Sequence, residues 1–77
     1  MNSKVIYFPE LRGLMASKGI TISELSRTTG IKKTTLSNKL NGVTEFSISE
    51  VQKISGVLNI ENIEEYFFNS KFEITDL

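Results

Sequence analysis

Hydrophobic residues recur at helical spacing in the first part of this 77-residue chain. Between residues 9 and 18, Leu11 and Met15 lie four positions apart, which places them on one face of a helix. Pro9 suits the first turn of that helix, because its missing N–H would have no intrahelical partner there. Gly13 lowers helix stability, so we expect it to mark a close approach of another element. The pattern predicts a first helix over about residues 9–18.

Two short motifs predict the starts of two further helices. The sequences Thr-Ile-Ser-Glu at 21–24 and Ser-Ile-Ser-Glu at 47–50 have the form of a capping box. In this motif the hydroxyl accepts a hydrogen bond from the Glu amide, and the Glu carboxylate accepts one from the amide of the capping residue. Gly30 favours an end to the first of these helices, which we expect over 21–29. The second is expected to continue to about Asn59.

The segment between these two helices allows two interpretations. Leu36 and Leu40 lie four positions apart, and the pair Asn-Gly follows at 41–42. Asn-Gly is also typical of a type I′ hairpin turn, with 43–46 as the returning strand. Apolar and polar residues do not alternate before the pair, so we favour a helix over 32–41 that ends in a left-handed residue of the pair.

The two ends of the chain carry the remaining signals. Residues 61–68 are amphipathic and predict a fifth helix. Residues 71–75 alternate with period two, as in a short strand, and residues 4–8 are the other strand candidate. We expect the two ends to pair, either within one chain or across a dimer.

Together these elements predict an all-α fold of five helices with possible short strands at the chain ends. The chain is long enough for one small domain. We expect a single domain over 1–77, with a helical core at about 9–68 and a tail at 69–77. The residues predicted to form the hydrophobic core are Leu11, Leu14, Met15, Leu25, Ile31, Leu36, Leu40, Val51, Ile54 and Leu58.

Composition narrows the possible chemistry. The chain contains no cysteine and no histidine. This excludes disulfide bridges, zinc sites built on Cys or His, and mechanisms that need an imidazole base. The adjacent carboxylates of Glu64 and Glu65 point in different directions on a helix, so they do not form an acid–base pair. We expect no enzymatic activity, no metal or other cofactor, and no small-molecule substrate.

Apolar runs in the sequence are short. Residues 5–8 form a run too short for the core of a signal peptide, and a run of about 18 apolar residues occurs nowhere. We therefore expect a cytoplasmic protein with no membrane partner.

Charge is distributed unevenly along the chain. Nine basic and nine acidic side chains give a formal net charge of zero. Residues 21–42 nevertheless carry four basic side chains and one acidic, whereas residues 61–77 carry one basic and five acidic. A locally basic surface suits an anionic partner. An ordinary solvated helical surface accounts for the same distribution equally well.

Two short helices joined by a tight turn form a helix-turn-helix unit. Leu25, Gly30, Leu36 and the Asn-Gly pair at 41–42 follow one another at a characteristic spacing. With these residues, the chain over about 9–68 resembles the phage-repressor-type helix-turn-helix family, the Cro and repressor-like (XRE-type) domains.

The resemblance implies a sequence-specific DNA-binding transcription regulator of phage or bacterial type, often a repressor. Its implied partners are double-stranded DNA and, as a homodimer, a second copy of the chain. The segment 32–41 would then be the recognition helix in the major groove. The positions that match the family's base readers are Lys33, Thr34, Ser37 and Asn38. The positions expected to hold phosphates are Lys32, Lys39, Asn41 and Thr44.

The chain departs from the family pattern at three positions, the mildest being Ser26 in place of a small Ala in the second helix. Ile22 stands where the family often has Gln, which removes one contact to the DNA backbone. Lys32 replaces the usual Ser or Thr cap of the recognition helix and cannot accept a hydrogen bond. We expect water or a bound phosphate to satisfy the amides at that helix start.

The C-terminal segment holds more hydrophobic side chains than one small core needs. The residues expected to form a dimer contact or to pack the tail are Tyr66, Phe68, Phe72 and Ile74. The acidic and aromatic character of this segment also motivates an alternative function. The same fold would then be a protein–protein interaction module, such as an antirepressor or a polymerase-binding factor.

Overall fold

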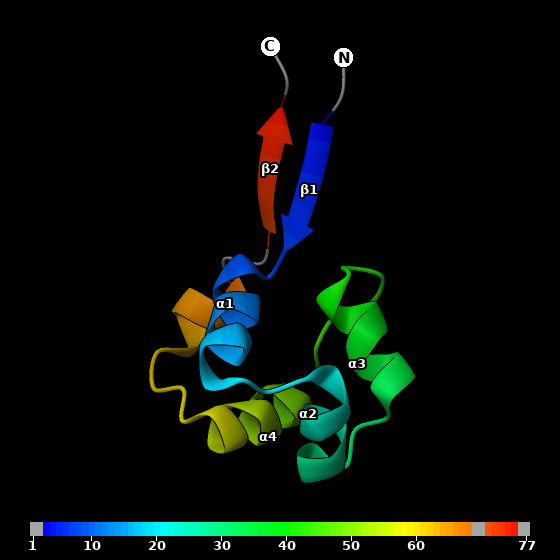
Figure 1. The fold of residues 1–77 in the computed structure, drawn as a ribbon, viewed down its shortest axis with the longest axis vertical. Helices are drawn as coiled ribbons and strands as arrows, with labels where there is room; N and C mark the ends of the chain where they lie inside the picture. The colour runs from blue at the N-terminus through cyan, green and yellow to red at the C-terminus, as the bar shows by residue number, and fades with distance from the viewer. Residues whose placement is uncertain (1–2, 69–70, 76–77) are drawn as a thin grey trace.

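In the part of the chain that the structure describes, four α-helices, one π-helical turn and two short strands make up the fold (Figure 1). The computed structural model describes residues 3–68 and 71–75, with side chains for residues 6–68. The elements in chain order are β1 (Ser3–Tyr7), α1 (Pro9–Lys18), α2 (Ile22–Thr29), α3 (Lys33–Leu40), α4 (Ile48–Leu58), η1 (Glu64–Phe68) and β2 (Lys71–Thr75). Among the residues described, none of these helices combines the length and apolar character needed to cross a bilayer. The predicted all-α architecture is confirmed, and its fifth helix is the single turn η1.

The helix starts follow the predicted capping signals, with one difference. At α4, the Ser47 hydroxyl accepts from the Glu50 amide (3.1 Å) and the Glu50 carboxylate accepts from the Ser47 amide (2.8 Å). At α2, the Thr21 hydroxyl accepts from the Glu24 amide (3.1 Å). The Glu24 carboxylate accepts from the Thr21 hydroxyl (3.3 Å) rather than from the Thr21 amide, so that half of the predicted box is wrong.

The end of α3 decides between the helix and hairpin interpretations. Residues Lys33–Leu40 are helical, and no strand follows them in residues 43–46. Gly42 has a φ of 76°, whereas Asn41 has a φ of −94°. Gly42 is therefore the left-handed residue that stops the chain from continuing as a helix.

The hydrophobic core lies among the four helices and η1. Eight of the ten predicted core residues are buried, whereas Leu14 and Val51 are partly buried and pack against the others. Three further residues complete the core: Phe8, Ile60 and Phe67. Phe46 makes edge-to-face contacts with Phe8 (5.1 Å between ring centroids) and with Phe67 (5.5 Å). These rings connect the start of α1 to η1.

The two chain ends pair with each other within one chain. β1 and β2 are antiparallel, with a register that runs from Ser3 opposite Thr75 to Tyr7 opposite Lys71. Figure 1 shows this ribbon projecting from the helices. The molecule is accordingly elongated, with extents of 41 × 25 × 24 Å. The prediction of pairing ends is thus confirmed in its intramolecular form.

Candidate nucleic-acid interface

The turn between α2 and α3 is fixed by short hydrogen bonds. The Ser26 hydroxyl donates to the Ile31 carbonyl (2.6 Å), and the Thr29 hydroxyl accepts from the Ile31 amide (3.2 Å). Ile31 is itself buried, at 7% exposure. Because polar and apolar contacts both hold this turn, α3 has a defined direction relative to α2.

One side of α3 is buried and the other faces solvent. Leu36 and Leu40 are 0% and 1% exposed, and they attach the helix to the core. Lys33, Thr34 and Asn38 are exposed, and Ser37 is half-buried. Figure 1 shows α3 at the side of the molecule, with no element beyond it. The four predicted base readers therefore lie on one accessible surface, which we call the α3 face (Lys33, Thr34, Ser37 and Asn38).

The dimensions of the α3 face suit a DNA groove. Five residue steps separate Lys33 from Asn38, which is about 7.5 Å along a helix. This distance matches about two base-pair steps of 3.4 Å. A single helix with its side chains also fits the major groove, which is about 12 Å wide.

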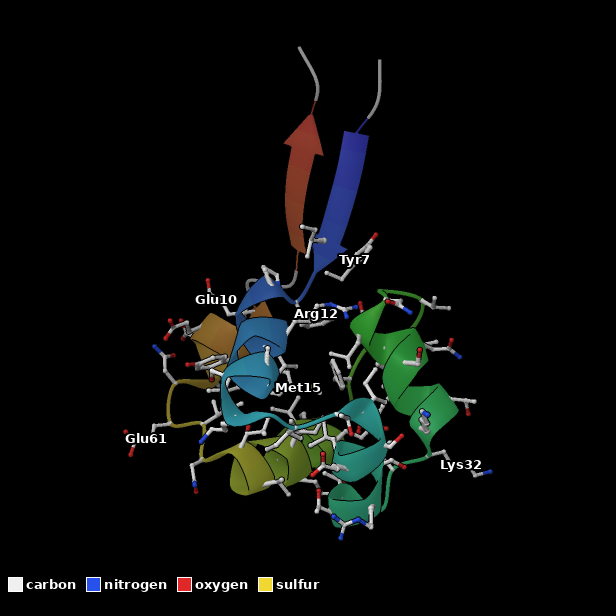
Figure 2. The ribbon with its side chains drawn as sticks, viewed as in Figure 1. Tyr7, Glu10, Arg12, Met15, Lys32 and Glu61 are labelled. Carbon is white, nitrogen blue, oxygen red and sulfur yellow. The ribbon has the colours of Figure 1, made fainter. Side chains whose placement is uncertain are left out.

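The N-terminal end of α3 is open. Lys32 occupies the capping position, and no side chain makes a capping hydrogen bond there. The first amide of α3 with a backbone acceptor is that of Leu36, which donates to the Lys32 carbonyl (2.9 Å). The preceding amides and the helix dipole make this end electropositive. Lys32 and Lys33 are both exposed beside it, and Figure 2 shows Lys32 directed away from the fold.

Lys39 occupies a different position from the other candidate phosphate ligands. Its Nζ donates to Glu50 Oε1 (2.6 Å) and to the Glu45 carbonyl (2.8 Å). The two charged side chains are only 13% and 18% exposed. Burial raises the pKa of Glu50, but hydrogen bonds from Lys39 and Ser47 lower it by more, so the pKa lies below its ordinary value. Lys39 already serves two acceptors inside the fold and is a weaker phosphate candidate than Lys32.

Asn41 and Thr44 are exposed in the loop that follows α3. Arg12, which no sequence pattern assigned to the site, contacts Asn41. Its Nη2 donates to Oδ1 of Asn41 (2.9 Å) and to the Leu40 carbonyl (2.6 Å). These partners are 29 and 28 residues away along the chain, so no local sequence pattern could have indicated the contacts.

The predicted dimer or tail residues occupy different environments. Tyr66 is half-buried and packs against the core, whereas Phe68 is 71% exposed. Phe68 borders a groove of about 610 Å³ whose other aromatic lining residues are Tyr7, Phe8, Phe46 and Phe67. Phe72 and Ile74 lie on β2, opposite Ile6 and Lys4, and their side chains are outside the described residues.

A buried turn between two helices and an exposed second helix define a helix-turn-helix domain. Residues 10–65 match the Cro/C1-type HTH DNA-binding domain, so the chain belongs to this family. The resemblance to Cro and repressor-like domains is therefore confirmed. This membership assigns DNA binding by a regulator as the general function. The comparison with curated proteins gives no match.

Proposed function

We propose that the chain is a sequence-specific transcription regulator of phage or bacterial type, which acts in the cytoplasm and reads DNA with the α3 face. The observation that carries this proposal is the accessibility of that face next to an open, electropositive helix start. A helix held by Leu36 and Leu40 at its inner side offers only its outer side to a duplex. Placed in the major groove, it brings four polar side chains to the base edges.

Each residue of the α3 face has a chemistry suited to particular bases. Lys33 donates to guanine O6 and N7, and Asn38 bonds adenine through both ends of its amide. Thr34 combines a hydroxyl with a methyl group that contacts thymine. Ser37 lies half-buried beside them and adds one more hydroxyl. We therefore expect a recognition sequence that contains both a guanine and an adenine within each half-site.

Phosphate contacts would set the orientation of α3 without reading sequence. Lys32 lies at the open helix start, where a phosphate would also accept from the free amides. Asn41 and Thr44 are exposed at the opposite end of the helix. The proposal thus assigns one phosphate to each end of α3.

We also propose that the regulator binds as a homodimer to two half-sites about 34 Å apart. Exposed Phe68 beside an aromatic groove supports this, because a two-fold contact requires a projection and a recess on the same surface. Light scattering of the wild-type chain and of Phe68→Ser tests it. We expect a dimer for the wild type and a monomer for the variant. A wild-type monomer at concentrations where operator binds would contradict the dimer.

The proposal is tested by selecting ligands from a random DNA pool and titrating the selected duplex by fluorescence anisotropy. We expect sequence preference and an affinity that falls as salt rises. Lys33→Glu should weaken binding by at least about tenfold, since it reverses a charge in a base contact. Lys53→Glu makes the same charge change on an exposed part of α4 and is the matched control. Equal effects of the two variants, with unchanged helicity, would refute the assignment of the α3 face.

A second candidate function is a protein–protein interaction module on the same fold. Three large hydrophobic side chains favour it because they are well exposed: Val43 (69%), Ile48 (80%) and Phe68 (71%). Pull-down with immobilised wild-type chain tests this function. A specific protein partner that Lys33→Glu retains and Phe68→Ser loses would support the module over the regulator.

A further inference from the structure

Arg12 makes three hydrogen bonds that join three separate segments of the fold. Its Nε donates to the Tyr7 carbonyl at the end of β1 (2.7 Å). Its Nη2 donates to the Leu40 carbonyl (2.6 Å) and to Oδ1 of Asn41 (2.9 Å), both at the end of α3. Figure 2 shows Arg12 extending from α1 towards α3, below Tyr7. The guanidinium therefore connects α1, β1 and the C-terminal end of α3.

The last four carbonyl groups of α3 all have donors, and Arg12 supplies the final one. Three of them accept from backbone amides: Ser37 from Asn41 (3.0 Å), Asn38 from Val43 (2.9 Å) and Lys39 from Gly42 (3.2 Å). The fourth, that of Leu40, accepts from Arg12. A positive charge at this position also complements the helix dipole. The C-terminal end of α3 is thus closed, in contrast to its open N-terminal end.

The third bond of Arg12 fixes which end of the Asn41 amide faces outwards. An amide group has an acceptor oxygen at one end and a donor nitrogen at the other. Because Oδ1 accepts from Arg12, Nδ2 is the end turned away from the guanidinium. Asn41 is exposed, so this nitrogen is available to an external acceptor. A phosphate oxygen is such an acceptor, whereas an outward Oδ1 would be repelled by it.

We propose that Arg12 is a positioning residue for DNA binding: it holds Asn41 so that Nδ2 is presented to a backbone phosphate. The inference rests on the proposed function, because the phosphate is that of the bound duplex. Three N–H groups of Arg12 are already used inside the fold. The two N–H groups of Nη1 make no hydrogen bond within the described residues, so direct contact of Arg12 with a phosphate is the alternative that the test must separate from its action through Asn41.

Tyr7 also contacts the C-terminal end of α3. A Cβ added to Gly42 would collide with the Tyr7 ring, so this ring lies directly against the backbone of the turn. The turn that carries Asn41 is thus contacted by both Arg12 and the Tyr7 ring. These contacts orient the Asn41 amide before DNA arrives, which is the condition for a preorganised contact.

Binding of the selected duplex to Arg12→Met, Asn41→Ala and the double variant tests the inference. Each single variant should weaken binding about tenfold, the loss of one hydrogen bond to a charged phosphate. The double variant should bind no more weakly than either single one, and the dependence of affinity on salt should not change. Arg27→Met removes an exposed arginine of α2 and is the control for loss of charge.

Three results of the binding measurements would overturn the inference. If the two losses multiply and the salt dependence falls by about one phosphate contact, Arg12 binds DNA directly. If folded Arg12→Met binds as tightly as wild type, Arg12 has no part in binding. Asn41→Asp keeps the inference testable if the Arg12→Met variant does not fold, because the carboxylate of Asp can still accept a hydrogen bond from Arg12. It should fold normally but bind DNA at least about tenfold more weakly, since it offers a phosphate no donor. Wild-type affinity of this variant would also overturn the inference.

A measurement without DNA separates this inference from the proposed function. Asn41→Asp should lower the melting temperature more in the Arg12→Met background than in the wild type, because the unpaired carboxylate opposes the helix dipole. Equal effects in both backgrounds would refute the contact itself. If the contact is found but no duplex is selected from the pool, the proposed function fails and the positioning role fails with it.

Discussion

Replacing Lys39 by Met removes the ammonium that ties α3 to the start of α4. In the wild type, Nζ of Lys39 lies 2.6 Å from Glu50 Oε1, and the same carboxylate completes the capping box with Ser47. The variant leaves this carboxylate, at 18% exposure, without its counter-charge. We therefore expect Lys39→Met to destabilise the fold rather than to act on DNA directly.

The size of the effect follows from the burial of the pair. Exposed ion pairs contribute about 0–1 kcal/mol, and loss of one partner of a fully buried pair costs about 3–5 kcal/mol. At 13% and 18% exposure the Lys39–Glu50 pair lies between these limits, so we expect a loss of about 2 kcal/mol. In a domain of this size that corresponds to a fall in melting temperature of roughly 8–16 °C.

The loss of stability in Lys39→Met should also depend on pH. The pKa of Glu50 is lowered from 4.5, so its interactions stabilise the fold fully above that pH. This contribution disappears as the pH falls through the lowered pKa, because the carboxyl group becomes neutral. The difference in stability between wild type and Lys39→Met is therefore largest at neutral pH and shrinks below about pH 4.5.

Urea denaturation followed by circular dichroism, from pH 7 to pH 3, measures both effects. Lys53→Met removes an exposed lysine of α4 and should change the free energy of unfolding little. The reasoning is refuted if Lys39→Met is as stable as wild type, or if its deficit is independent of pH. A stable variant with weakened, less salt-dependent DNA binding would instead return Lys39 to the phosphate contacts.

The same denaturation assay tests three further substitutions. Ser55→Ala should raise the free energy of unfolding by about 1 kcal/mol, because the buried Ser55 hydroxyl has no partner in the described part of the chain; a loss would contradict this, and exposed Ser49→Ala is the control. Gly13→Ala should raise it by about 0.5–1 kcal/mol, because a Cβ there meets nothing within 4 Å. Gly42→Ala should lower it by at least about 1 kcal/mol, because φ is 76° and the Tyr7 ring fills the space. Effects of the opposite sign would contradict the packing described around Gly13 and Gly42.

The parts of the fold that the sequence predicted are those set by neighbouring residues. The Ser47–Glu50 capping box and the left-handed Gly30 each involve residues within four positions of one another. Their outcome depends on local backbone and side-chain geometry, and so the helix bounds are correct to within a few residues. The open start of α3 was predictable for the same reason. The Lys32 side chain has no acceptor, so it cannot cap the helix, whatever it packs against.

Contacts between distant segments were beyond the reach of sequence patterns. Arg12 was not assigned to the site, because Leu40 and Asn41 come near it only after α1 and α3 pack. Lys39 was assigned to a phosphate on the family resemblance, and no local pattern indicated its partner Glu50, which lies 11 residues away on the next helix. Gly13 was expected to mark a close approach of another element. A Cβ added at Gly13 would meet no atom within 4 Å, so that prediction is wrong.

The most direct test of the account follows backbone amide signals by NMR while the selected duplex is added to the wild-type chain. Binding of α3 in the major groove predicts the largest changes at Lys32–Asn38 and at the turn around Asn41. A duplex of scrambled sequence should perturb mainly Lys32 and Asn41, where phosphates bind. Changes confined to η1 and the ribbon, with the α3 signals unmoved, would contradict the claim that the exposed side of α3 reads DNA.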